Sequence, residues 1–348
     1  MNVKVILFAG AAVLALAACS KNEVVETNDH AIGFSNYIPK TVTGRADATF
    51  VNGNDLVSGQ EFVVYGYNQK AADFSTTLNP KFMPGVQVTY KGGNTLETAG
   101  NNTYSPTRYW PKDEANNKLA FYAYYPVSSY IQPTVTEGLG KYVVTVDTDP
   151  SKNVDFLVAD LVKDQAYSKT ENTGAVKLNF KHQLAKVKFL VNTNVEDTDT
   201  KVTLNSLTVK KVKTTGTLTP AYETDFSTAW SDPATPTDFP VYSTDMVLGS
   251  TAVTNDDAHT YLMVPQTLGD DVVATVVYTY QTGTDEAVKN TVDVKLKDIV
   301  SADGAIISWE KNNYIVYTFT IGLQPIKFAA SVTDWEAEKD GISLSSNL

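Results

Sequence analysis

Cleavable peptide bonds are the first chemistry that this sequence points to. Arginine occurs at only two positions, Arg45 and Arg108, so an arginine-specific protease would find two sites in the chain. Arg45 stands in Gly44-Arg45-Ala46-Asp47, where glycine and aspartate are typical of an exposed turn. Arg108 stands in Thr107-Arg108-Tyr109-Trp110, a run typical of a packed strand. Arg45 is therefore the site that we expect a protease to reach.

Groups that could catalyse a reaction are scattered. The histidines, His30, His182 and His259, have no partner at metal-ligand spacing. His182 falls in the apolar phase of its strand, which is typical of a buried core or interface histidine. The sequence has no P-loop and no G-x-S-x-G, G-x-G-x-x-G or H-E-x-x-H motif. We expect no enzymatic activity and no cofactor.

One acidic run resembles a calcium-binding loop in part. Its alternating oxygen-bearing residues are Asp147, Asp149, Ser151, Asn153 and Asp155. Such a loop needs glycine at its sixth position and glutamate at its twelfth, and Lys152 and Val158 stand there. We therefore expect no metal site.

The N-terminus has the pattern of an export signal. An apolar run from Val5 to Ala15 follows Lys4 and is too short to span a bilayer. Leu16-Ala17-Ala18-Cys19 resembles a lipobox, at which bacterial lipoproteins are cut and lipidated; the alternative is an ordinary secretion signal with an incidental cysteine. Cys19 is the only cysteine and has no disulfide partner. We expect residues 1–18 to be a signal peptide, acyl chains on Cys19 to bind a membrane, and residues 19–30 to form a polar tether.

A strand precedes Arg45. Ile32, Phe34, Ile38 and Val42 recur with the period of a half-buried β-strand and share one face. The turn at Arg45 then separates this strand from the rest of the chain. The sequence therefore predicts a first strand, residues 32–45, that belongs to a core and is joined to it by one short cuttable loop.

The remainder predicts an all-β fold of two sandwiches. Alternating or doubly apolar runs recur along the chain, and no long helical period interrupts them. At His182 to Leu184 the apolar phase reverses, which a bulge or a passage into a second sandwich would produce. We favour the second explanation, with an N-terminal sandwich at 31–183 and a C-terminal one at 184–348.

Composition limits the partners of the chain. The net charge is −11 at pH 7 and 43% of the residues are hydrophobic. An acidic chain of this kind is not suited to bind nucleic acid or anionic lipid, but its apolar content can fill a sizeable core.

Several phrases, taken in order, resemble the fimbrillin family of fimbrial subunits from oral and gut anaerobes. They are Tyr109-Trp110-Pro111 followed by Leu119 to Pro126, Val154 to Ala159, Leu178 to Val187, Tyr261 to Gln266, Trp309 with Asn313-Tyr314, and Val332 to Trp335. The resemblance covers nearly the whole chain. Each phrase alone is weak, and their order makes the match specific.

The resemblance implies a function in assembly. Family members are lipoproteins with two transthyretin-like β-sandwich domains, exported to the outer membrane and then displayed in a surface fimbrium. An arginine-specific protease cuts a loop, the first strand leaves, and a strand of another subunit replaces it by donor-strand exchange. By position, Arg45-Ala46 matches the cut and Ile32 to Val42 the departing strand. A donor tail at 336–348, with Ile342 and Leu344 in phase, is short and leaves a stalk or tip position open.

An alternative from another class is a cell-surface lipoprotein that binds glycans and never polymerises. Its signature would be exposed aromatic platforms. Trp230, in a polar neighbourhood, is the tryptophan that we expect to be exposed. A host or bacterial surface glycan or protein would be the partner.

Overall fold

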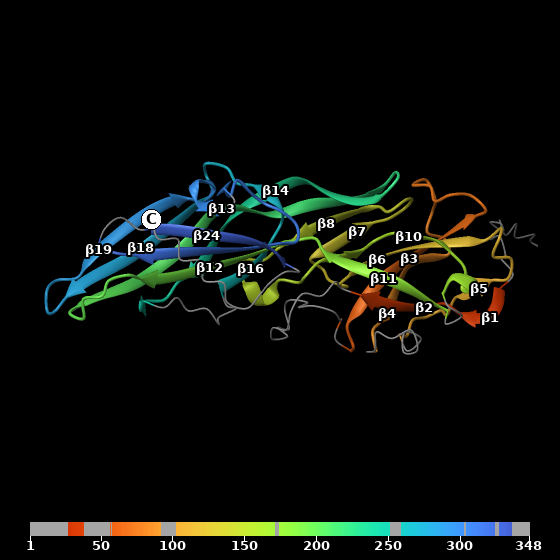
Figure 1. The fold of residues 1–348 in the computed structure, drawn as a ribbon, viewed down its shortest axis with the longest axis horizontal. Coiled ribbons are helices and arrows are strands. Elements are labelled where there is room, and N and C mark those ends of the chain that lie inside the picture. The colour runs from red at the N-terminus through yellow and green to blue at the C-terminus, as the bar shows by residue number, and fades with distance from the viewer. Residues whose placement is uncertain are drawn as a thin grey trace, which may run out of the picture.

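Strands make up nearly all of the regular structure (Figure 1). This computed structural model describes residues 27–37, 56, 58–91, 102–170, 174–250, 259–302, 304–323 and 327–335. Within those ranges, helix is confined to short 3-10 turns: η2 (Pro150–Lys152), η3 (Tyr167–Lys169) and η5 (Leu296–Asp298). The all-β prediction is confirmed, and the threonine, valine and tyrosine of the chain suit it because branched and aromatic side chains fit a pleated surface.

The N-terminal sheet has the strand order β2-β11-β9-β6-β3-β4, and β10 also pairs with β6. Its centre, β6, is buried along almost its whole length, so one sheet face contacts a small apolar core and the other a large one. This agrees with the doubly apolar run that the sequence shows there. The members are β2 (Gly33–Tyr37), β3 (Glu61–Lys70), β4 (Met83–Thr89), β6 (Lys118–Tyr125), β9 (Leu157–Ala159), β10 (Val162–Gln165) and β11 (Ala175–His182).

A second sheet joins both parts of the chain. Its order is β19-β18-β13-β8-β7, with β14 and β15 also paired to β13. β13 has 23 residues, which at roughly 3.3 Å per residue is about 75 Å of strand. It pairs with β18 near its start and with β8 near its end. The members are β7 (Ile131–Thr134), β8 (Lys141–Thr145), β13 (Thr200–Tyr222), β14 (Phe226–Tyr242), β15 (Met246–Val247), β18 (Val273–Thr282) and β19 (Val288–Lys295).

The third sheet, β16-β12-β23-β24, lies in the C-terminal part. It is formed by β16 (Thr260–Met263), β12 (Ala185–Thr193), β23 (Asn313–Ile321) and β24 (Lys327–Asp334). Three two-stranded ribbons complete the described strands: β1 (Thr27–Ala31) with β5 (Tyr109–Pro111), β17 (Gln266–Thr267) with β22 (Ser308–Trp309), and β20 (Val300–Ser301) with β21 (Gly304–Ala305). In Figure 1 the β1–β5 ribbon lies at one end of the elongated molecule and β18–β19 at the other.

The boundary predicted between residues 183 and 184 falls where the chain passes from β11 to β12, which belong to different sheets. Gln183 and Leu184, between them, are buried. The pairing of β8 with β13 continues strand hydrogen bonding across this boundary. The two parts therefore share a sheet, and the division into two tandem transthyretin-like sandwiches stays a prediction.

His182 lies at this junction and is buried, as a core or interface histidine should be. Its Nδ1 is 3.0 Å from Oδ2 of Asp155, and its ring stacks on that of Trp335 with 3.9 Å between centroids. The carboxylate of Asp155, a member of the calcium-like run, is thus paired with an imidazole.

The expectation that Trp230 is exposed was wrong. The ring is half-buried, because β14 lies over the junction and turns this side chain inward. Its Nε1 donates to the carbonyl of Gln183 at 2.9 Å, and its ring meets Phe156 edge-on. The indole is therefore part of the packing between the sheets.

Candidate functional site

The predicted removable strand includes β2, the edge strand of the N-terminal sheet. β2 pairs in parallel with β11, from Gly33 opposite Ala175 to Tyr37 opposite Asn179. Just before this ladder, the N–H of Gly33 donates to the carbonyl of Gly174 at 2.7 Å. Among the described strands, none pairs with the other edge of β2. Its departure would therefore leave the order of the remaining strands intact.

A loop covers that other edge. We call residues 102–108 the lip. The Tyr104 hydroxyl donates to the carbonyl of Ile32, and Nδ2 of Asn102 donates to the carbonyl of Phe34, both at 2.7 Å. The N–H of Ile32 donates in turn to the carbonyl of Arg108 at 2.8 Å. The strand thus lies in a groove between β11 and the lip.

Two side chains of this strand fill the small core. Ile32 is 2% exposed and Phe34 is completely buried. The ring of Phe34 meets Phe121 of β6 edge-on, with 5.5 Å between centroids, and lies 5.8 Å from the ring of Tyr104. Alternation of apolar residues gives this result because successive side chains of a strand point to opposite faces.

β1 precedes β2 and continues this segment toward the N-terminus. It pairs antiparallel with β5, with Ala31 opposite Tyr109. The ring of His30 stacks on that of Tyr167 with 3.9 Å between centroids and 3° between planes. Residues 27–37 are therefore held by several distant parts of the chain.

Gly174, directly before β11, lies close against this segment. Its φ is +72°, and a Cβ there would lie 2.6 Å from the carbonyl oxygen of Ala31. Its own carbonyl accepts from Gly33 and from Nε1 of Trp110. Both the backbone conformation and the space require glycine.

The lip hydroxyl is kept protonated. Burial raises the pKa of Tyr104, against smaller opposing effects of the Arg108 backbone and charge. A phenol that stays neutral keeps its O–H, so Tyr104 remains a hydrogen-bond donor to the strand throughout the neutral range.

The structure describes part of the predicted site. Ile32 and Phe34 lie in the groove and face the core together. Arg108 directly precedes β5 and is half-buried, and its N–H donates to the Tyr104 hydroxyl at 3.3 Å. The other predicted positions lie outside the described residues: Ile38, Val42, Arg45, Ala46, Cys19 and the tail 336–348.

Sequence reasoning missed the residues that hold the strand from outside. Asn102 and Tyr104 belong to a polar stretch without periodicity, and Gly174 stands alone before a strand. A glycine that directly precedes an apolar run is a weak signal of a close backbone approach. For the two lip side chains no local signal exists, because their partners are about 70 residues away.

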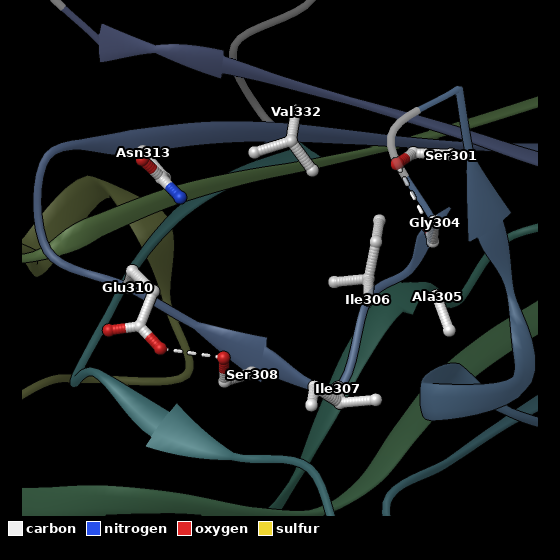
Figure 2. A pocket seen from close by; sticks show the side chains of 9 residues that line it. All are labelled: Ser301, Gly304, Ala305, Ile306, Ile307, Ser308, Glu310, Asn313 and Val332. Carbon is white, nitrogen blue, oxygen red and sulfur yellow. Dashed lines mark hydrogen bonds between the residues drawn. The ribbon is translucent and has the colours of Figure 1, made fainter.

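A recess lies in the C-terminal part of the chain, beside β24. Its volume is about 220 Å³, and Ile306, Ile307 and Val332 contribute to its wall (Figure 2). Ser308 donates to Glu310 and Ser301 to the carbonyl of Gly304, so these polar groups are engaged within the wall. The recess is therefore a shallow, mainly apolar surface depression.

Two further kinds of feature are absent from the described ranges. No three side chains of His, Cys, Asp or Glu converge there in a way that could hold a metal ion. Nor does any helix in the same ranges have the length and apolar character needed to cross a bilayer.

Comparison with known proteins gives a family match. Residues 45–335 match the model of a family described as fimbrillin-like. A fimbrial protein from Bacteroides vulgatus is 18% identical, with 88% of this chain and 100% of that chain covered and a TM-score of 0.63. A protein described as a putative cell adhesion protein from Bacteroides uniformis is 19% identical over 88% of this chain and 99% of its own, with a TM-score of 0.49. No curated protein matches the chain. The first of these likenesses supports the fold along most of the chain.

Proposed function

Because the chain belongs to the fimbrillin-like family, we propose that it is a cell-surface fimbrial subunit that assembles by donor-strand exchange. The precursor is lipidated on Cys19 at the outer membrane and cut between Arg45 and Ala46. The first strand, with Ile32, Phe34, Ile38 and Val42, then leaves, and a strand of another subunit takes its place. The observation that carries the proposal is that an edge strand seals an apolar core with Ile32 and Phe34.

The free energy that holds this strand is large enough to keep it seated only while it remains covalently joined to the rest of the chain. Burying an Ile or Phe side chain contributes roughly 1.5–3 kcal/mol, so Ile32 and Phe34 together contribute about 3–6 kcal/mol. As a separate peptide, a strand held by about 5 kcal/mol would have a Kd on the order of 0.2 mM. While the chain is intact, the strand is held at a high effective concentration and stays seated. Cutting the connection removes that advantage and lets the strand dissociate.

The position of the cut also links two events. The departing fragment would carry both the strand and Cys19, and the body would begin at Ala46. Release of the body from the membrane and opening of the groove would then happen together. The groove would become available only on subunits that have left their anchor.

The peptide bond after Arg108 is expected to be a poorer protease substrate than the one after Arg45. Its N–H donates to Tyr104, and its carbonyl accepts from Ile32. A protease needs the scissile segment extended in its own cleft, so these bonds would have to break first. We therefore expect cleavage at Arg45 while β2 is seated.

The test is limited digestion of the full chain with an arginine-specific protease. We expect one early product with Ala46 at its N-terminus, followed by an SDS-resistant ladder of oligomers. Arg45→Lys keeps the charge and should block both, whereas the matched Arg108→Lys should change neither. A cut chain that stays monomeric in the presence of a competent donor would count against strand exchange, and early cleavage at Arg108 would count against the proposed site.

The donor is a strand of another subunit. Within this chain the segment at 336–348 is one candidate, because Ile342 and Leu344 alternate in it. The residues that line the groove define the required donor strand more closely than the tail sequence does.

A further inference from the structure

The position of Phe34 in the groove is surrounded by aromatic rings. Phe121 meets it edge-on, at 5.5 Å and 76°, and Tyr104 lies tilted at 5.8 Å and 56°. Trp110 continues the cluster with an edge contact to Phe121 at 6.1 Å. Edge-to-face arrangements of this kind favour an aromatic ring beyond the apolar area that it buries. We call this position the aromatic subsite.

The lip fixes which face of a strand turns toward that subsite. Tyr104 and Asn102 donate to the carbonyls of Ile32 and Phe34, which are two residues apart on one edge of the strand. On the other edge Gly33 donates to Gly174. A strand that slipped by one residue would turn its apolar side chains away from the core. A slip by two would place a different side chain among the rings.

Resting on the strand exchange proposed above, we propose that the groove selects its donor by an aliphatic residue followed two positions later by an aromatic one. Asn102 and Tyr104 hold one edge of the strand in the correct phase, and the rings of Phe121 and Tyr104 select among registers that differ by two residues. The partner is thus a subunit whose exposed strand carries that spacing. Tyr104 therefore contributes to donor specificity through its ring, whereas Asn102 fixes the phase of the strand.

This requirement separates two segments of the chain itself. Gly341 to Leu348 contains no aromatic residue. Beyond residue 30 the Ile-x-Phe spacing of Ile32-Gly33-Phe34 recurs once, in Ile326-Lys327-Phe328. Phe328 belongs to β24, which pairs only with β23 among the described strands, and its side chain is 37% exposed. A second copy would therefore offer residues 326–332, and not 341–348, as the better fit.

Peptide competition on the cut full chain tests the selection. A labelled peptide of residues 31–37 is bound to protein that has been cleaved after Arg45, and unlabelled peptides compete with it. We expect residues 326–332 to compete and residues 341–348 to be on the order of 100-fold weaker, as should be the 31–37 peptide with alanine at Phe34. Equal competition by 341–348 or by the alanine peptide would overturn the proposal, as would failure of 326–332 to compete when 31–37 does.

A second measurement keeps this inference separate from strand exchange itself. If no peptide enters the cut chain and no polymer forms, strand exchange is refuted, and the subsite is judged on uncut protein. There we expect Phe34→Leu to lower the melting temperature less in a Phe121→Leu background than in the original chain, because the edge contact with Phe121 is then already lost. Additive effects of the two substitutions would mean that the rings do not favour an aromatic occupant.

Discussion

Tyr104→Phe tests how the lip holds β2. The change keeps the ring beside Phe34 and removes the hydroxyl that donates to the carbonyl of Ile32 at 2.7 Å. A buried carbonyl left without its donor costs about 1–3 kcal/mol. Because this bond exists only while the strand is seated, the cost appears as easier opening of the strand. We expect the open fraction to rise roughly 5- to 150-fold.

Hydrogen exchange of the uncut chain is the direct assay. The amides of Ile32 and Gly33, which donate to Arg108 and Gly174, report the opening of each edge of the strand. Both should exchange faster in Tyr104→Phe by the factor above. Tyr130→Phe is the matched control, since its hydroxyl donates to Asp147 outside the groove. Unchanged exchange at both amides, or an equal change in the control, would refute the role given to the lip.

Two further predictions concern the backbone and the buried phenols. Gly174→Ala places a methyl group 2.6 Å from the carbonyl of Ala31 at a φ of +72° and should loosen residues 27–37 by about 1–3 kcal/mol in the same exchange assay. The control Gly283→Ala has a similar φ of +53° and nothing near its Cβ, so these amides should not respond. Burial, and then the charge of Asp149, raise the pKa of Tyr261 to about 12 from 10.0. The contribution of this raised pKa to the free energy of unfolding is therefore complete below pH 10. It is lost as the pH rises toward 12, by at most about 2.7 kcal/mol. Urea unfolding from pH 9 to 12 should show this fall, and a Tyr261→Phe variant with an equally steep fall would contradict it.

Local periodicity was enough to predict the parts of the site that depend on one strand. The alternation of Ile32 and Phe34 shows which side chains share a face, and both are buried in one core. The continuous apolar run of β6 indicates burial on two faces, which the two cores confirm. Such patterns succeed because the geometry of a strand alone determines where successive side chains point.

Long-range contacts account for what the sequence could not show. The strand around Ile32 pairs in parallel with β11, which follows it by about 140 residues. The length of β13, which joins the two parts of the chain, depends on partners from both of them. Trp230 was misjudged for the same reason: its neighbours along the chain are polar, but Phe156 and Gln183 decide its burial.

The lip also restricts the direction in which a replacement strand can enter. Oδ1 of Asn102 accepts from the N–H of Lys91 at 3.0 Å, which leaves Nδ2 pointing at the carbonyl of Phe34. A reversed strand exchanges the positions of N–H and C=O along its edge and would present a donor to this donor. Turning the amide over would break the bond to Lys91, so the mismatch cannot be relieved without a loss elsewhere. A donor strand is therefore expected to run parallel to β11, as β2 does, and one amide side chain contributes direction to the selection.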